Sequence, residues 1–163
     1  MLLMATTMVL TACEKDPDPD PQPQPQSENI SLSGTTWEGS LNNTFLYQGT
    51  LEMVVSFNII IDFNDTLNGE FFMDMNIEVP QYPSAGQRMN DSWPHTYTFD
   101  GKTCTLTYAE GVELDEGEDP TLAVLRYNAA DTTFIMPVDD PDAEEMLGTD
   151  TVVFHLTRGT LSF

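Results

Sequence analysis

The chain has 163 residues, of which 27 are acidic and 5 are basic, so its formal net charge is −22. Because proteins bind nucleic acid by replacing phosphate counterions with Lys and Arg, this charge excludes a nucleic-acid-binding function. It also excludes electrostatic attraction to an anionic membrane surface, so any membrane attachment must be covalent or apolar. A folded part of about 135 residues is long enough to bury a core without disulfides or a bound metal.

The N-terminal residues 1–12 (MLLMATTMVLTA) are apolar and uncharged. This stretch is too short to span a bilayer, but its length is typical of the hydrophobic region of a signal peptide. No Lys or Arg precedes it, which a start codon upstream of Met1 would explain. The stretch ends in Leu10-Thr11-Ala12-Cys13, which resembles the lipobox of bacterial lipoproteins. That resemblance implies that Cys13 is acylated and becomes the first residue of the mature chain.

Residues 13–30 follow with Pro at every second position from Pro17 to Pro25. Each proline fixes its own φ and holds the preceding residue in an extended conformation. We therefore expect a stiff, polyproline II-like linker between the lipid and a folded domain that spans residues 31–163.

Glu14, Lys15 and Asp16 directly follow the lipidated cysteine. They resemble the short acidic signal that places lipoproteins of Bacteroidetes on the outer face of the outer membrane. The resemblance implies an outer-membrane lipoprotein that is exposed on the cell surface. An anchor that faces the periplasm is the alternative.

The apolar residues of the folded part recur with a period of two, which indicates half-buried β-strands. In residues 51–63 (LEMVVSFNIIIDF) every odd position is apolar, and residues 69–79 (GEFFMDMNIEV) continue the pattern. The intervening NDTLNG (64–69) is rich in turn-forming residues, so these two strands are predicted to pair as a hairpin. A shorter strand is expected earlier, at TWEGSL (36–41).

Residues 80–95 (PQYPSAGQRMNDSWPH) are predicted to form a long loop between strands. Long ordered loops in compact domains often carry function. Tyr82, Arg88 and Trp93 are therefore the candidate recognition residues, because aromatic and guanidinium groups can contact a sugar or a partner protein. The alternative is that Trp93 fills the mouth of a barrel.

Two further hairpins and a last strand complete the pattern. Asp100-Gly101 predicts a two-residue turn within residues 95–108, and residues 128–131 are the expected turn within residues 121–138. Residues 151–158 (TVVFHLTR) form the last strand. The chain thus has about eight strands and no segment with a convincing helical period.

A meander of this kind hides its edge strands most economically by closing into a barrel. We therefore predict an all-β fold, an eight-stranded antiparallel meander barrel, with an open β-sandwich as the alternative. GTTWEGSL (34–41), the 97–108 hairpin and VVFHLTR (152–158) resemble the small lipocalin-like (calycin-like) lipoproteins of Bacteroidetes. This resemblance implies that Trp37 packs across the closed end of the barrel beneath Arg158, as a cation–π contact that closes it.

The residues that could carry chemistry show no recognisable site. If Cys13 is acylated, Cys104 has no disulfide partner, and its alternation with inward-facing neighbours predicts a buried, inert thiol. His95 and His155 lack the short ligand spacing of a zinc site, and His155 is out of phase with its apolar neighbours, so it is expected to face solvent. We predict no catalytic residue, metal or cofactor, because serine-hydrolase elbows and phosphate-binding loops are absent from the sequence.

Two acid-rich stretches, 110–119 and 139–145, could collect calcium, but neither matches the EF-hand loop. They are better explained as solvated loops that keep the protein soluble and monomeric.

These observations predict a lipid-anchored binding or interaction module without enzymatic activity. Its partner would be a small apolar or glycan ligand, or another protein. Inward-facing Phe and Met suit an apolar ligand, yet the same residues would fill a narrow eight-stranded barrel. A carrier needs a connected internal void of about 300 Å³ or more. The alternative is a structural or accessory subunit, or an inhibitor, in a surface protein complex, with a solidly packed barrel.

Overall fold

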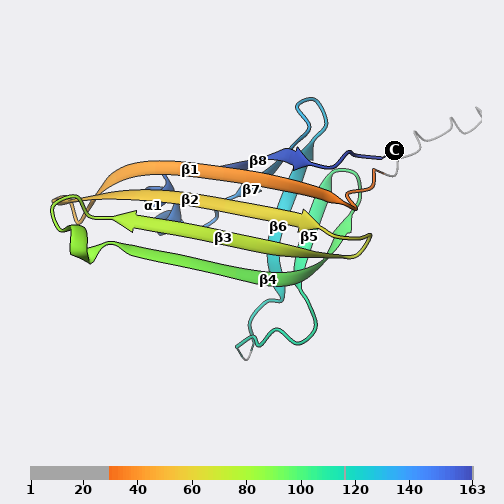
Figure 1. Cartoon of the computed structure of the whole chain (residues 1–163), viewed down its shortest axis with the longest axis horizontal. Coiled ribbons are helices and arrows are strands. Elements are labelled where there is room, and N and C mark those ends of the chain that lie inside the picture. The colour runs from red at the N-terminus through yellow and green to blue at the C-terminus, as the bar shows by residue number, and fades with distance from the viewer. Residues whose placement is uncertain (1–29, 116, 163) are drawn as a thin grey trace, which may run out of the picture.

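The computed structural model describes residues 30–115 and 117–162. Within them each strand pairs antiparallel with the next, and the last strand pairs with the first, so the barrel is closed (Figure 1). The strands are β1 (Thr35–Tyr47), β2 (Leu51–Phe63), β3 (Asn68–Glu78), β4 (Gln87–Phe99), β5 (Thr103–Tyr108), β6 (Thr121–Asn128), β7 (Thr133–Pro137) and β8 (Thr151–Arg158). The predicted eight-stranded antiparallel meander barrel is confirmed. The predicted signal peptide, Cys13 and the proline-rich segment lie outside the described residues.

The two-residue period of the sequence arises because successive side chains of a strand point to opposite faces of the sheet. Along β2 the buried residues are all odd-numbered: Val55, Ile59, Ile61 and Phe63. Their even-numbered neighbours face outward, as strand geometry requires. On the partner strand β1, the outward Thr36 donates its hydroxyl hydrogen bond to the Asp62 carboxylate.

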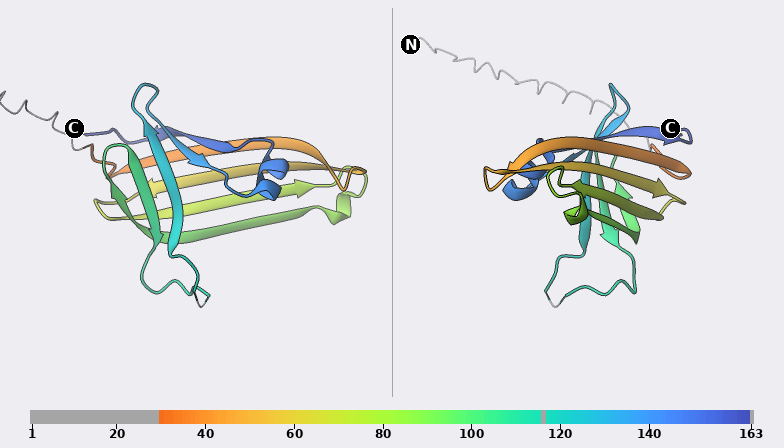
Figure 2. Two further views of the ribbon diagram at one scale, coloured as in Figure 1. Left: turned by 180° about the vertical axis from the view of Figure 1, so that it is seen from behind. Right: turned by 60° about the vertical axis from the view of Figure 1, so that its left-hand side comes forward.

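The two halves of the barrel differ in strand length. β1 to β4 have 11 to 13 residues, whereas β5 to β8 have 5 to 8. β4 pairs with β5 only at residues 95–99, and β1 pairs with β8 only near Trp37. The long strands therefore continue as a protruding four-stranded sheet (Figure 2), which we call the extension and define as residues 40–58 and 73–93.

The opposite end, where all eight strands pair, is the closed end, and it is filled with side chains. Trp37 is fully buried, its ring centroid lies 4.6 Å from that of Phe134, and its Nε1 donates a 2.9 Å hydrogen bond to Thr35 Oγ1. Edge-on aromatic contacts of this kind add to the burial of apolar surface. The largest side chains below 2% exposure here include Trp37, Phe63, Phe134, Phe154, Leu106 and Leu125.

Two local predictions are corrected by the structure. The turn between β4 and β5 is longer than predicted: Phe99 pairs with Cys104, and the Asp100 carboxylate accepts from the backbone N–H groups of Lys102 (2.8 Å) and Thr103 (2.6 Å). This Asx-type bonding stabilises the longer loop. Asn128 of β6 pairs with Thr133 of β7, so the turn between these strands lies close to the predicted turn at residues 128–131.

The acid-rich stretch predicted as a loop contains a short helix, α1 (Pro141–Leu147). Asp140 caps it by accepting from the backbone N–H groups of Asp142 and Ala143, and Gly148 ends it in the left-handed conformation at φ 69°. Proline at the start and glycine at the end are typical helix boundaries. Seven residues are too few for a helical hydrophobic period to be visible in the sequence.

Candidate functional site

The segment predicted as a long recognition loop is mostly strand. β3 ends at Glu78 and β4 begins at Gln87, so the connection is residues 79–86, with one short 3-10 helix at Pro83–Ala85. The strand was not recognised because residues 87–92 lie on the extension and are exposed on both faces. Without a buried face, the sequence shows no alternation of apolar and polar residues.

The three candidate recognition residues of this segment do not form one site. Tyr82 lies in the connection and is 62% exposed. Arg88 faces outward beside Asp74, whereas Trp93 faces inward and packs against Phe71, with ring centroids 6.0 Å apart. Arg88 and Trp93 are thus on opposite faces of β4, and the sheet separates them.

The predicted contact between Arg158 and Trp37 is also corrected. Arg158 is exposed and pairs with the outward-facing Thr36, and the β1–β8 register shifts between Thr36 and Trp37. Trp37 faces inward, where the rings of Phe134 and Tyr127 contact it. The bulge therefore places the guanidinium and the indole on opposite faces of the sheet, and aromatic packing buries Trp37 without a cation.

One candidate site is a hollow on the outer face of the extension, with a volume of about 390 Å³. We call it the outer polar hollow. Its polar lining residues come from four adjacent strands: Ser40, Asn42, Ser56, Asn58, Asp74, Asn76 and Arg88. All are even-numbered and hence on the same face of the sheet.

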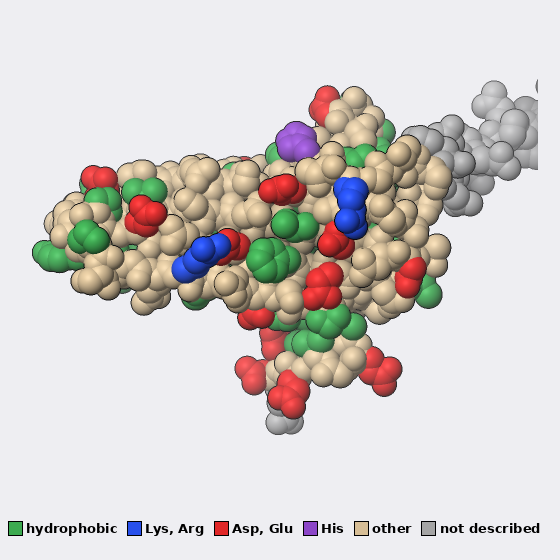
Figure 3. Space-filling model, viewed as in Figure 1, with side chains coloured by type: hydrophobic (Ala, Val, Ile, Leu, Met, Phe, Trp, Pro, Cys, Tyr) green, Lys and Arg blue, Asp and Glu red, His purple; other side chains and the backbone are tan. Residues whose placement is uncertain are grey.

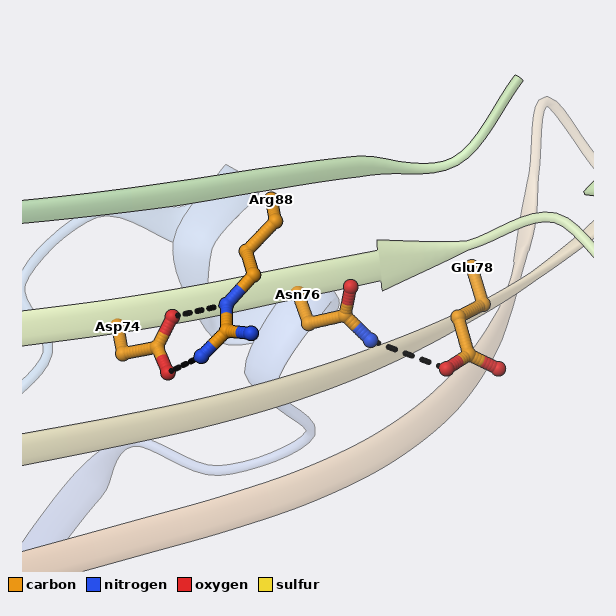
Figure 4. Close-up of polar contacts among 4 residues, drawn as sticks. All are labelled: Asp74, Asn76, Glu78 and Arg88. Atoms are coloured by element: carbon orange, nitrogen blue, oxygen red, sulfur yellow. Dashed lines mark hydrogen bonds and ion pairs between the residues drawn. The ribbon is translucent and has the colours of Figure 1, made fainter. Parts of the chain in front are cut away.

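Arg88 and Asp74 form a two-pronged ion pair in this hollow (Figure 4). Arg88 Nε donates to Asp74 Oδ1 at 3.0 Å, and Nη2 donates to Oδ2 at 2.7 Å. These hydrogen bonds and the opposite charges lower the pKa of Asp74 and raise that of Arg88. Beside the pair, Asn76 Nδ2 donates a 3.0 Å hydrogen bond to Glu78 Oε1. The carboxylates of Asp74 and Glu78 therefore already accept hydrogen bonds from neighbouring side chains.

Asn58 lies at the centre of the outer polar hollow, paired with Ser40 on one side and with Asp74 on the other. Its Oδ1 atom is buried and has no hydrogen-bond partner among the described residues. Buried acceptors without a donor are rare and costly, by about 1–3 kcal/mol. The hollow thus contains an acceptor that a bound group could satisfy.

A second candidate site is a cleft of about 510 Å³ at the far tip of the extension, between α1 and the β1–β2 hairpin. We call it the α1 cleft. Its apolar lining comes from Phe45, Leu46, Tyr47, Met53 and Met146, and acidic residues of α1 border it. The share of apolar surface is larger in the cleft than in the outer polar hollow.

The helix beside the cleft is attached to β1. Asn43 Nδ2 donates to the backbone carbonyls of Glu145 (3.3 Å) and Met146 (3.0 Å), and Leu147 is buried. A Cβ atom on Gly148 would lie 2.8 Å from Asn43, so glycine permits this close approach. Asn43 belongs to the part of β1 that does not pair with β8.

The inner face of the extension is apolar and only partly covered. One inner row crosses all four strands, with the pairs Leu41–Phe57, Phe57–Met75 and Met75–Met89. Met89 is 45% exposed, and Leu41 and Phe57 are half-buried. This face continues from the α1 cleft toward the closed end.

Cys104 and the two histidines differ in their burial. Cys104 is fully buried, as predicted, and burial raises the pKa of its thiol to about 12. His155 is exposed, as predicted. His95 is 1% exposed, which its sequence context did not indicate, and burial lowers its pKa to about 4. The described residues contain no group of three or more side chains that could hold a metal ion.

Of the outer polar hollow, the sequence singled out only Arg88, and of the α1 cleft it singled out only the acid-rich stretch that contains Asp142 and Glu145. Ser56 and Asn58 lie at even positions, where strand alternation predicts outward-facing polar residues in any case, so the sequence shows no signal of the outer polar hollow. The α1 cleft has no such signal, because its walls come from segments about one hundred residues apart.

No protein-family model, curated protein or solved structure matches this chain. Among the helices in the described part, none has the length and apolar character needed to cross a membrane. The fold and the sites together define a closed eight-stranded β-barrel with a packed end and a protruding, partly open sheet.

Proposed function

We propose that this protein is a lipid-anchored binding module of the cell envelope, without catalytic activity, that takes a small apolar ligand in the α1 cleft. The observation that carries the proposal is the cleft itself, whose volume of about 510 Å³ lies in the usual range of ligand sites. Met53 and Met146 line it, and methionine side chains adapt to ligands of irregular shape. Because the closed end is packed, the ligand would be held at the open end rather than enclosed in the barrel.

The charge of the cleft favours one kind of ligand. Asp142 and Glu145 border the apolar lining, and the whole chain carries a net charge of −22. An anionic head group would be repelled there, whereas a neutral or cationic one would be accepted. The expected ligand is therefore an apolar chain or ring whose polar end is neutral or cationic.

The place where the described part of the chain begins supports an anchored role. Ser31 pairs with Ser162 at the closed end, whereas α1 and the β1–β2 hairpin, which line the α1 cleft, lie away from that end (Figure 1). A tether attached there would direct the cleft away from the membrane. Acylation of Cys13, a place on the outer face of the outer membrane, and kinship with the lipocalin-like lipoproteins of Bacteroidetes are parts of this proposal.

The ligand proposal is tested with the neutral probe N-phenyl-1-naphthylamine on the full chain carrying Cys13→Ala. We expect saturable fluorescence enhancement that Met53→Glu weakens about tenfold, because a carboxylate would stand in the apolar lining. The matched control is Val153→Glu, at a residue that is 40% exposed outside the cleft and should leave binding unchanged. Equal binding by the Met53→Glu variant would overturn the proposal.

The anchor is tested separately, by fractionation of cells that express the chain. Cys13→Ala should move the protein from the membrane fraction to the soluble fraction. Protease added to intact cells should digest the anchored protein if it faces outward and leave it intact if it faces the periplasm. Retention of the Cys13→Ala variant in the membrane would contradict acylation.

A second candidate function is that of an accessory subunit or inhibitor in a surface complex. The observation that favours it is the β4 edge at residues 87–93, which continues past β5 without a partner strand among the described residues. Such an edge can receive an extended segment of another protein. Partners should then co-purify with the anchored protein and be lost on Trp93→Ala and Tyr82→Ala. Recovery of the protein alone from washed membranes would contradict this candidate.

A further inference from the structure

The outer polar hollow has an ordered arrangement of side chains. The strand register places them in two adjacent rows across the sheet. The pairs of the first row are Ser40–Asn58, Asn58–Asp74 and Asp74–Asn90, and those of the second are Asn42–Ser56, Ser56–Asn76 and Asn76–Arg88. Every member of both rows has a hydroxyl, amide, carboxylate or guanidinium group. The rows therefore form a continuous polar surface four strands wide.

Several polar atoms of these groups have no hydrogen-bond partner among the residues that the structure describes. Arg88 binds Asp74 through Nε and Nη2, and its third nitrogen points away from that carboxylate (Figure 4). Asn76 donates to Glu78 through Nδ2, and its Oδ1 is directed elsewhere (Figure 4). Together with the buried Oδ1 of Asn58, the hollow offers both donors and acceptors to a ligand.

The charges of the hollow exclude ionic ligands. Its one carboxylate and its one guanidinium neutralise each other in a bidentate pair. A phosphate or carboxylate ligand would have to displace Asp74 in a strongly acidic protein. A metal ion would find no second carboxylate in the lining. A neutral group with paired donors and acceptors fits better, and vicinal hydroxyls have this property because each hydroxyl both donates and accepts.

Apolar side chains lie next to the polar rows on the same face. Ile60 and Phe72 are paired across β2 and β3, in the row adjacent to Asn58 and Asp74, and both are half-buried. Figure 3 shows apolar side chains beside acidic and basic ones on this face of the molecule. A ring that presents apolar C–H groups could cover Phe72 while its hydroxyls reach the polar rows.

We propose that the outer polar hollow is a second binding site, specific for a neutral carbohydrate. Sugar hydroxyls bind Asn58, Asn76 and Arg88, and the apolar face of one pyranose ring packs on Phe72. This site lies on the opposite face of the sheet from the inner apolar row, so it is independent of the ligand proposed for the α1 cleft.

The proposal is tested by NMR titration of the ¹⁵N-labelled full chain with maltotriose, cellotriose, mannotriose and tri-N-acetylchitotriose. At least one sugar should give saturable shifts at about 20 mM or below, confined to the two polar rows and to the side-chain amides of Asn58 and Asn76. Arg88→Met should weaken this binding about tenfold, because it removes a charged donor. Trigalacturonate should bind more weakly than the neutral sugars, because the acidic protein repels it.

The matched control is Arg126→Met, which removes an exposed arginine from β6, outside the hollow, and should leave sugar binding unchanged. Asn58→Leu is a second test variant. Arg88 has 67% of its side chain exposed, so its replacement should leave folding intact even if Asn58→Leu disturbs the sheet. Absence of saturable shifts with all four neutral sugars, or equal binding by the Arg88→Met variant, would overturn the proposal. Failure of N-phenyl-1-naphthylamine to bind in the α1 cleft would not contradict the carbohydrate proposal, because the two sites are independent.

Discussion

Gly69 of β3 lies directly opposite His95 of β4, and a Cβ atom on Gly69 would be only 2.6 Å from His95 Nε2. The carbonyl oxygen of Asp62, on the neighbouring strand, would lie closer still. Glycine at this position therefore permits the close approach of the imidazole. Phe63 and Tyr97 complete the surroundings of the ring, with centroids 5.9 and 6.4 Å away.

Gly69→Ala should destabilise the protein by about 3 kcal/mol, because the added methyl group meets a backbone oxygen that cannot move aside. The comparison variant is Gly49→Ala, where φ is +73° and the surrounding space is open. That change should lower the free energy of unfolding by only about 1 kcal/mol, because alanine is strained in the left-handed conformation. Both values are measured by urea denaturation. Equal costs would contradict the tight packing at Gly69.

The stability of the protein should fall as the pH falls from about 6.5 to about 4, in part because of His95. Burial lowers the pKa of His95 from 6.5 to about 4, so the unfolded chain takes up its proton first as the pH falls. The loss amounts to about 3 kcal/mol at pH 4 and becomes constant about one pH unit lower, where both states are protonated. Carboxylates also titrate in this range, so the effect is measured as a difference between variants.

His95→Leu should remove this pH-dependent contribution, and His155→Leu should retain it. His155 is exposed, so it is the matched control for loss of a histidine. The free energy of unfolding is measured by urea denaturation at several pH values between 4 and 7. Parallel curves for the wild-type and His95→Leu proteins across this range would contradict the assigned pKa.

Cys104 should not react with thiol reagents in the folded protein. Burial raises the pKa of its thiol from 9.0 to about 12, which lowers the reactive thiolate fraction at pH 8 about a thousandfold. In the Cys13→Ala variant, where Cys104 is the remaining cysteine, iodoacetamide labelling is followed by mass spectrometry. Rapid labelling is expected only after addition of guanidinium chloride. Rapid labelling of the native protein would show that β5 opens readily.

The closed end should depend on aromatic packing and not on Arg158. Phe134→Ala should cost about 3–5 kcal/mol, because Phe134 is fully buried and its loss leaves a cavity beside Trp37. Arg158→Ala should change stability by less than about 0.5 kcal/mol, since Arg158 is exposed. Thermal and urea denaturation provide both values. A large loss of stability in the Arg158→Ala variant would contradict this and would favour the predicted cation–π contact between Arg158 and Trp37.

Most of the barrel could be predicted from the sequence because strand alternation is a local property. The apolar odd positions of residues 51–63 and 69–79 identified β2, β3 and the side chains that face the core. Prediction failed where the buried face was missing, as at residues 87–92 of β4, and where the element was short, as in α1. In both places the local pattern was too weak to show the element.

The candidate sites could not be predicted, since neither is formed by one segment. The outer polar hollow needs the register of four strands, which brings Ser40 and Arg88 to one surface. The α1 cleft needs the Asn43 contact that holds the helix against β1. Conversely, Arg88 and Trp93 are close in the sequence but belong to opposite faces of the sheet.

The sequence by itself determined that this protein is a strongly acidic, all-β chain, because charge and two-residue periodicity depend only on neighbouring residues. Only the tertiary structure decided that the last four strands are too short to cover the first four, and that a bulge beside Trp37 turns Arg158 outward. These outcomes depend on which residues become partners across the sheet. That choice is made by the packing of the whole core.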